Sequence, residues 1–178
     1  MAQRGSSVTT TGTGYFYGAV DRFLGYSSAA STATVSQQAF TTGTAPASPY
    51  EAQFFVRSVS TNTATYLATR LEDVRVFAGQ TVTLSFYAKT DVAQTMSAVT
   101  LEQNFGSGGS ASVTTTTTLS PALTTGWQRF SVSVAVPSIS GKTVGTSSYL
   151  QIQWQGALNK NLDFWGVQLE AGSVATAF

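Results

Sequence analysis

The sequence contains neither cysteine nor histidine among its 178 residues. Nucleophilic triads and dyads, and the usual zinc and haem sites, need an imidazole or a thiolate, so these chemistries are excluded. The adjacent Glu72 and Asp73 leave carboxylate chemistry open, but neighbouring carboxylates at a turn more often cap it than catalyse. We therefore expect a protein that is not an enzyme and has no cofactor or transition metal. Asp21 and Glu72 are expected to form ion pairs with arginines rather than to be ligands, but a jelly-roll calcium site built from carboxylates and loop carbonyls stays open.

Charge is also scarce, since charged residues make up 10% of the chain and the formal net charge is +1. Ordinary globular proteins have about 25% charged residues. The sequence contains no basic stripe or polybasic segment, so neither nucleic acid nor a membrane is an expected partner. The first ten residues lack the apolar core of a signal peptide, and no apolar run is long enough to span a bilayer. These features predict synthesis and folding in a cytoplasm, unless another route exports the chain.

Long helical periods are missing as well, and short alternating segments take their place. In residues 80–89, Val82, Leu84 and Phe86 point one way while Thr83 and Ser85 point the other, which is the period of a half-buried antiparallel strand. About ten such segments predict an all-β fold, an antiparallel two-sheet β-sandwich of the jelly-roll type. The predicted strands are residues 15–24, 32–40, 51–59, 64–72, 80–89, 95–105, 113–119, 127–136, 149–155 and 162–170.

The same patterns predict the core and the connections. Asp73 is expected to cap one helical turn that ends at Gly79, residues 60–63 suit a hairpin, and residues 106–112 are expected to form a flexible loop. The threonine run in residues 113–119 is expected to form an exposed edge strand. The predicted core contains Leu84, Phe86, Leu101, Phe130, Val132, Val134, Ile152, Trp154, Trp165, Val167 and Leu169.

Seven segments spread along the chain carry a resemblance to a known family. They are QRG at 3–5, DRF at 21–23, LEDVR at 71–75, Gly79 with VTLSF at 82–86, EQNFGSGGS at 102–110, PSISGK at 137–142 and VQLEAGSVAT at 167–176. Together they resemble a recurrent phage virion domain, similar to the carbohydrate-binding-module-like jelly rolls of tail fibres and phage heads. The departures are a missing apolar first strand before QRG, Phe23 in place of a common Trp and Ala177 in place of a common Pro.

This resemblance implies a structural accessory protein of a tailed-phage virion, made in the host cytoplasm. The main expectation is a head decoration, or cement, protein that docks on the capsid lattice as a homotrimer. Residues 1–14 are expected to form an extended arm, with Gln3 and Arg4 in the particle-docking part, and residues 15–178 the jelly-roll domain. Because this domain is nearly the whole chain, it is expected to bind capsid or tail proteins itself. The alternative is a tail-fibre or receptor-type carbohydrate-binding module that contacts host glycans.

One strand offers a candidate glycan-binding surface. Tyr149, Gln151, Gln153 and Gln155 share the outward face of residues 149–155. Amides beside an aromatic ring can hydrogen-bond to a sugar and stack on it. An ordinary polar sheet face or a subunit contact would show the same pattern, so both alternatives stay open at this point.

Overall fold

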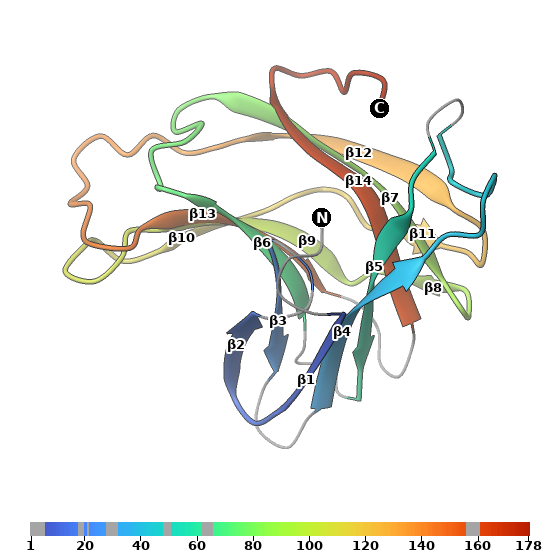
Figure 1. Ribbon diagram of the computed structural model, residues 1–178. Coiled ribbons are helices and arrows are strands. Elements are labelled where there is room, and N and C mark those ends of the chain that lie inside the picture. Colours follow the sequence, from blue (N-terminus) through green and yellow to red (C-terminus); the bar gives the residue numbers. More distant parts are fainter. Residues whose placement is uncertain are drawn as a thin grey trace.

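The computed structural model describes residues 6–17, 20, 22–27, 32–47, 51–61, 66–155 and 161–178. Within these residues, two six-stranded antiparallel sheets face each other, and a two-stranded ribbon lies at one end (Figure 1). No helix is present in the described part of the chain. The prediction of an all-β, two-sheet jelly roll is therefore confirmed.

The two large sheets each combine strands that are distant in the sequence. In order across the sheet, sheet A contains β1 (Ser7–Thr11), β4 (Thr32–Ala39), β5 (Phe54–Ser60), β14 (Asn161–Ala171), β7 (Thr81–Thr90) and β12 (Gln128–Ala135). Sheet B contains β10 (Val113–Thr116), β9 (Ala98–Asn104), β13 (Tyr149–Gln155), β6 (Tyr66–Glu72), β3 (Phe23–Ser27) and β2 (Gly14–Tyr17). The ribbon pairs β8 (Gln94–Thr95) with β11 (Ala122–Leu123).

The core lies between the sheets and is rich in aromatic rings. Phe86 of β7 is fully buried, and its ring centroid lies 5.7 Å from that of Trp154 on β13. Leu84, Leu101, Val134 and Ile152 are buried with them, as predicted. The partly buried Phe130, Val132, Val167 and Leu169 pack against this cluster. Alternation therefore identified the inner face of most strands.

Trp165 is the exception, because β14 changes face at a β-bulge. Between Trp165 and Gln168 the register on β7 shifts, so Gly166 and Val167 together stand opposite the single residue Phe86. Phe164 thus points into the core with no exposed surface, while Trp165 packs on the outer face. The prediction of Trp165 as a core residue is wrong for this reason.

Two predicted connections also differ in the structure. The hairpin at residues 60–63 is wrong, because β5 belongs to sheet A whereas β6 belongs to sheet B. The expected flexible loop at residues 106–112 is instead packed against residues 143–146, at the left of Figure 1. A Cβ on Gly145 would lie 2.0 Å from the carbonyl oxygen of Ser107. Glycine is therefore needed there for close approach rather than for flexibility.

Residues 7–11 of the predicted arm form β1, which pairs with β4 at the edge of sheet A. Three of its five residues are threonines, whose branched Cβ favours extended backbone. Gln3 and Arg4 lie outside the described residues. At one edge of sheet B, β10 confirms the predicted threonine edge strand over Val113–Thr116, although the prediction extended it to residue 119.

Asp73 begins a series of turns between β6 and β7 rather than a helical turn. Its carboxylate oxygen accepts a hydrogen bond of 2.9 Å from the backbone N–H of Arg75. Gly79 has a φ of 75° and is in the left-handed region, as predicted. The capping role of Asp73 is therefore present, and the chain crosses there from sheet B to sheet A.

Candidate functional site

The outer face of sheet B carries a continuous cluster of aromatic and amide side chains. The pairing registers place side chains of β2, β3, β6, β13 and β9 in rows across this face. We call the cluster the tyrosine face, and it comprises Tyr15, Tyr17, Tyr26, Tyr66, Arg70, Glu102, Tyr149, Gln151 and Gln153. Its members come from strands that are distant in the sequence, since Tyr15 and Gln153 are 138 positions apart.

Arg70 lies at the centre of the tyrosine face, between two rings. Its guanidinium carbon is 4.3 Å from the ring centroid of Tyr15 and 3.9 Å from that of Tyr149. Its Nη1 donates a hydrogen bond of 3.2 Å to the hydroxyl of Tyr17, and its Nε donates to Oε1 of Gln151. A planar guanidinium suits this arrangement, since it can stack and donate in its own plane.

A layer of amides beneath the rings is held by Glu102. Nε2 of Gln153 donates to Oε2 of Glu102 at 2.8 Å, and Nε2 of Gln151 donates to the same oxygen at 3.3 Å. Nδ2 of Asn104 donates to the other carboxylate oxygen at 3.2 Å. Nε2 of Gln151 also donates to the hydroxyl of Tyr15 at 3.2 Å. Glu102 stands beside Gln151 on the neighbouring strand and fixes these amides, and Gln151 in turn holds Arg70 and the hydroxyl of Tyr15 in place.

Three tyrosines extend the face toward the edge of the sheet. The rings of Tyr26 and Tyr66 are stacked, with centroids 4.5 Å apart and planes 8° apart. The hydroxyls of Tyr15 and Tyr66 share a hydrogen bond of 3.0 Å. Burial, followed by this hydrogen bond, raises the pKa of Tyr66, and burial raises the pKa of Tyr149 against the opposing effect of Arg70. Both phenols therefore stay neutral at physiological pH.

The four residues predicted from β13 all lie on this outer face, but at different depths. Gln151 is fully buried and Gln153 is 7% exposed, so both position other side chains instead of meeting solvent. Tyr149 and Gln155 are half-buried. The most accessible rings are Tyr15, 38% exposed, and Tyr17, 48% exposed, and both come from β2.

Sequence reasoning missed the residues contributed by the other strands. The segment Gly14–Tyr17 alternates Tyr15 and Tyr17 on one side with Phe16 on the other, which was a detectable signal for an aromatic outer face. Arg70 and Glu102 gave no such signal. They reach Gln151 only because β6 and β9 flank β13, an order that one sequence does not reveal.

The carboxylates that the sequence left open for catalysis or metal binding do not form a site among the described residues. Asp73 pairs with Arg75 at 3.0 Å, and the first cause of its lowered pKa is the hydrogen bond from the Arg75 backbone. Glu72 is exposed opposite Tyr149. Asp21 lies outside the described residues. Within the described ranges, no group of three or more acidic side chains is placed to hold a metal ion. The same part of the chain contains no helix that could cross a membrane.

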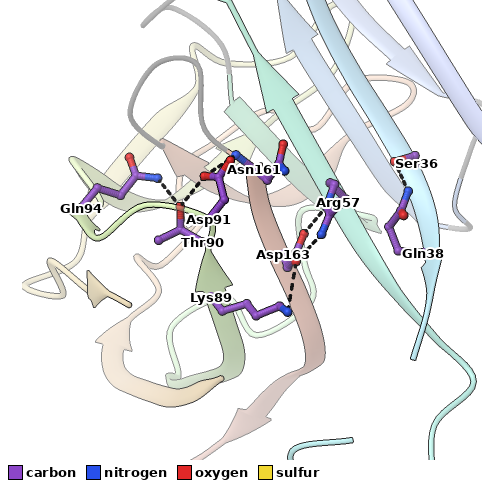
Figure 2. A network of polar contacts seen from close by, with 9 residues as sticks. All are labelled: Ser36, Gln38, Arg57, Lys89, Thr90, Asp91, Gln94, Asn161 and Asp163. Atoms are coloured by element: carbon purple, nitrogen blue, oxygen red, sulfur yellow. Dashed lines mark hydrogen bonds and ion pairs between the residues drawn. The ribbon is translucent and has the colours of Figure 1, made fainter. Parts of the chain in front are cut away.

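Sheet A carries charged side chains on its outer face, but they are used within the fold (Figure 2). Arg57 donates two hydrogen bonds to the carboxylate of Asp163, at 2.7 and 2.8 Å, and Nζ of Lys89 lies 3.8 Å from the same carboxylate. The Asp163 side chain is 3% exposed, and its hydrogen bond raises the pKa of Arg57. A carboxylate so enclosed is a structural group.

Comparison with known proteins supports the fold assignment. No known family profile and no curated protein sequence matches the chain. Among solved structures, the CBM22-1 xylan-binding domain of Xyn10C from Paenibacillus barcinonensis is 13% identical, with a TM-score of 0.59 over 93% of this chain and 99% of that one. The CBM22-2 domain of the same protein is 15% identical, with a TM-score of 0.55 over 78% and 86%.

A third solved structure with the same fold is an enzyme. The Stig cyclase Fisc from Fischerella sp. TAU is 12% identical, with a TM-score of 0.51 over 90% of each chain. The shared feature is the fold. At these identities the likeness carries no residue roles, and the fold serves both binding modules and a cyclase. Function must therefore be argued from the site.

Proposed function

We propose that the protein is a carbohydrate-binding module and that the tyrosine face is its binding surface. The observation that carries the proposal is the stack of Tyr15, Arg70 and Tyr149 above a layer of fixed amides. Sugar rings have apolar faces and equatorial hydroxyls, so they pack on aromatic rings and hydrogen-bond at the ring edges. Likeness in fold to a xylan-binding domain supports this class of ligand.

The charges of the face favour a neutral glycan chain. Arg70 is the one cation of the tyrosine face, and its donors already meet Gln151 and Tyr17. Glu102 and the nearby Glu72 would repel uronate or sialate groups. The exposed rings of Tyr15 and Tyr17 stand on the edge strand, which gives a chain room to extend beyond one sugar unit.

Affinity electrophoresis in gels containing soluble xylan tests the proposal, with a neutral glucan and an acidic pectin as further probes. We expect retardation by at least one neutral polysaccharide and none by pectin. Tyr17→Ala should remove the retardation. Phe54→Ala is the matched control, because Phe54 is 44% exposed but does not belong to the tyrosine face. Retardation that survives Tyr17→Ala and Tyr149→Ala alike would disprove the assignment of the face.

We also propose that binding proceeds without catalysis. On the tyrosine face, Glu102 is occupied by hydrogen bonds from three amides, and glycosidases need a second carboxylate across the scissile bond. Prolonged incubation with the retarding polysaccharide should release no reducing ends. Release of reducing ends that is abolished by Glu72→Gln would show an enzyme instead.

The virion assignment is a second candidate function, and it rests on the resemblance of segments such as QNFGSGGS and VQLEAGSVAT to phage virion domains. It is compatible with glycan binding. A homotrimer that docks through Gln3 and Arg4 remains its specific prediction. Replacing both by alanine is the appropriate test, because deletion through residue 14 would remove β1 from β4. Undiminished binding of the double variant to phage capsids, together with a monomer by light scattering, would exclude this function.

A further inference from the structure

Sheet A opens between β5 and β14, and an apolar pocket of about 380 Å³ lies at the opening. β14 pairs with β5 only over Asn161–Phe164, opposite Val56 to Val59, and afterwards its ladder continues on β7 alone. Figure 1 shows the two strands diverging from this point. The pocket reaches from Phe54, which is 44% exposed, to Phe164, which is fully buried in the sandwich.

The β-bulge on β14 shapes one wall of this pocket. Gly166 has a φ of 60°, a conformation that glycine adopts readily, and a Cβ there would lie 3.1 Å from the ring of Phe178. Trp165 turns outward at the bulge, and its ring centroid lies 4.4 Å from that of Phe178. At this wall, the flat ring of Phe178 therefore lies directly against the backbone of Gly166, which has no side chain.

The lining residues determine what the pocket can hold. Rings and branched side chains from both sheets form its walls, among them Phe23, Phe54, Val56, Phe164 and Val167. Among the described lining residues, the polar side-chain groups are the amides of Gln37 and Gln53 and the indole N–H of Trp165, and none of these residues has a charged side chain. A charged ligand would lose its hydration without a charged partner among these residues, whereas an apolar ring would gain by leaving water.

We propose that this pocket is a binding site for a small uncharged molecule with a flat apolar ring and one group that hydrogen-bonds to an amide. Its volume falls in the range of small-molecule sites and exceeds that of cavities that bind a single benzene. The pocket opens through sheet A, so it is separate from the tyrosine face, which lies on the outer side of sheet B. The proposal does not depend on glycan binding.

The test uses the full chain and N-phenyl-1-naphthylamine, a neutral probe whose fluorescence rises when it leaves water. We expect a saturable rise, with chemical-shift changes in the amide signals of Gly166 and Val167. Two variants narrow the pocket from different walls, Ala52→Phe and Val167→Phe, and each should weaken probe binding by about tenfold through steric overlap. Ala135→Phe is the matched control, since Ala135 is exposed on β12 and does not line the pocket.

Thermal unfolding of each variant first establishes that it is folded. A variant with a cooperative transition and lost binding supports the site. Equal probe binding by the control and both narrowing variants would overturn the proposal, because the probe would then lie on the surface. Absence of any saturable rise in the parent protein would overturn it as well. The variant Tyr17→Ala should bind the probe normally, which separates this site from the proposed glycan site.

Discussion

The two outer faces of the sandwich both carry aromatic rings, but they differ in the polar groups that these rings carry. On sheet A, Phe40, Phe55, Trp127 and Trp165 form a cluster with centroids 4.9 to 5.9 Å apart, and Tyr87 adjoins it with its ring centroid 5.4 Å from that of Trp165, so most of these rings have no hydroxyl. On sheet B the rings are tyrosines, whose hydroxyls lie at the surface of the face. One face resembles a second small core, and the other resembles a prepared binding surface.

The placement of charge follows the same division. Asp163 on sheet A is enclosed by Arg57 and Lys89, so its charge is neutralised inside the fold. Arg70 on sheet B has no carboxylate partner among the described residues and is held between neutral rings. The comparison therefore separates residues that stabilise the protein from residues that we propose to bind a ligand.

The largest expected effect lies in the core that both faces cover. Phe86→Ala should lower the free energy of unfolding by about 3–5 kcal/mol, because it removes a fully buried ring in contact distance of Phe130, Trp154 and Phe164. Urea denaturation measures the loss. Tyr87→Ala, one residue along on the outer face, is the control and should cost less. A parent-like transition for Phe86→Ala would refute the assignment of faces on β7.

Asp163→Ala should have the second largest effect and should act on stability alone. Removing the carboxylate leaves Arg57 and Lys89 facing each other without a counter-charge, and breaking a buried pair typically costs about 3 kcal/mol. Retardation by a neutral polysaccharide should not change in the folded variant. Loss of retardation at full stability would reverse the roles assigned to the two faces.

A matched pair of Arg→Lys variants sharpens the comparison further. Arg57→Lys should destabilise the protein by about 1 kcal/mol, because one of two hydrogen bonds to Asp163 is lost, and leave polysaccharide binding intact. Arg70→Lys should do the opposite. An ammonium cannot fill the planar slot between Tyr15 and Tyr149, so glycan affinity should fall by about tenfold with little change in stability. Equal effects of both variants on polysaccharide binding would contradict the assignment of stability to sheet A and of binding to sheet B.

The sequence predicted the strands better than the site, and the reasons are physical. Side-chain alternation is local, so it identified β13 with its correct bounds and its inward Leu150, Ile152 and Trp154. The bulge at Gly166 reverses the side-chain alternation within one strand. A single glycine in a sequence is equally compatible with a bend, a helix cap or a β-bulge. This is why Trp165 was assigned to the wrong face.

The tyrosine face depends on strand order, which is non-local. Gln151 was identified from its own strand, but its partners Arg70, Tyr15 and Glu102 are 81, 136 and 49 positions away. Nothing in local propensity links such distant segments. Burial also differs from the prediction, since a glutamine with outward alternation can still be covered by rings from a neighbouring strand.

The smallest expected effect concerns the turn that connects the two sheets, at Asp73. The hydrogen bond from the Arg75 backbone, then the Arg75 side chain, lowers the pKa of Asp73 from its ordinary 3.8. A carboxyl whose pKa is lower in the folded state stabilises the fold above its unfolded pKa, and this contribution is lost as the pH falls through the folded pKa. Asp73→Asn keeps an acceptor and tolerates the φ of 80°, but it cannot titrate.

The melting temperature of Asp73→Asn should therefore lie slightly below that of the parent near pH 6, and the gap should close as the pH falls below about 3.8. Thermal scans of both proteins across this range provide the measurement. A gap that is constant at every pH would mean that Asp73 acts through its shape and backbone bonds alone. The side chain of Asp73 is exposed and belongs to neither face, so the substitution should leave both polysaccharide retardation and probe binding unchanged. The variant is therefore a reference for effects that arise from the turn between β6 and β7 rather than from either outer face.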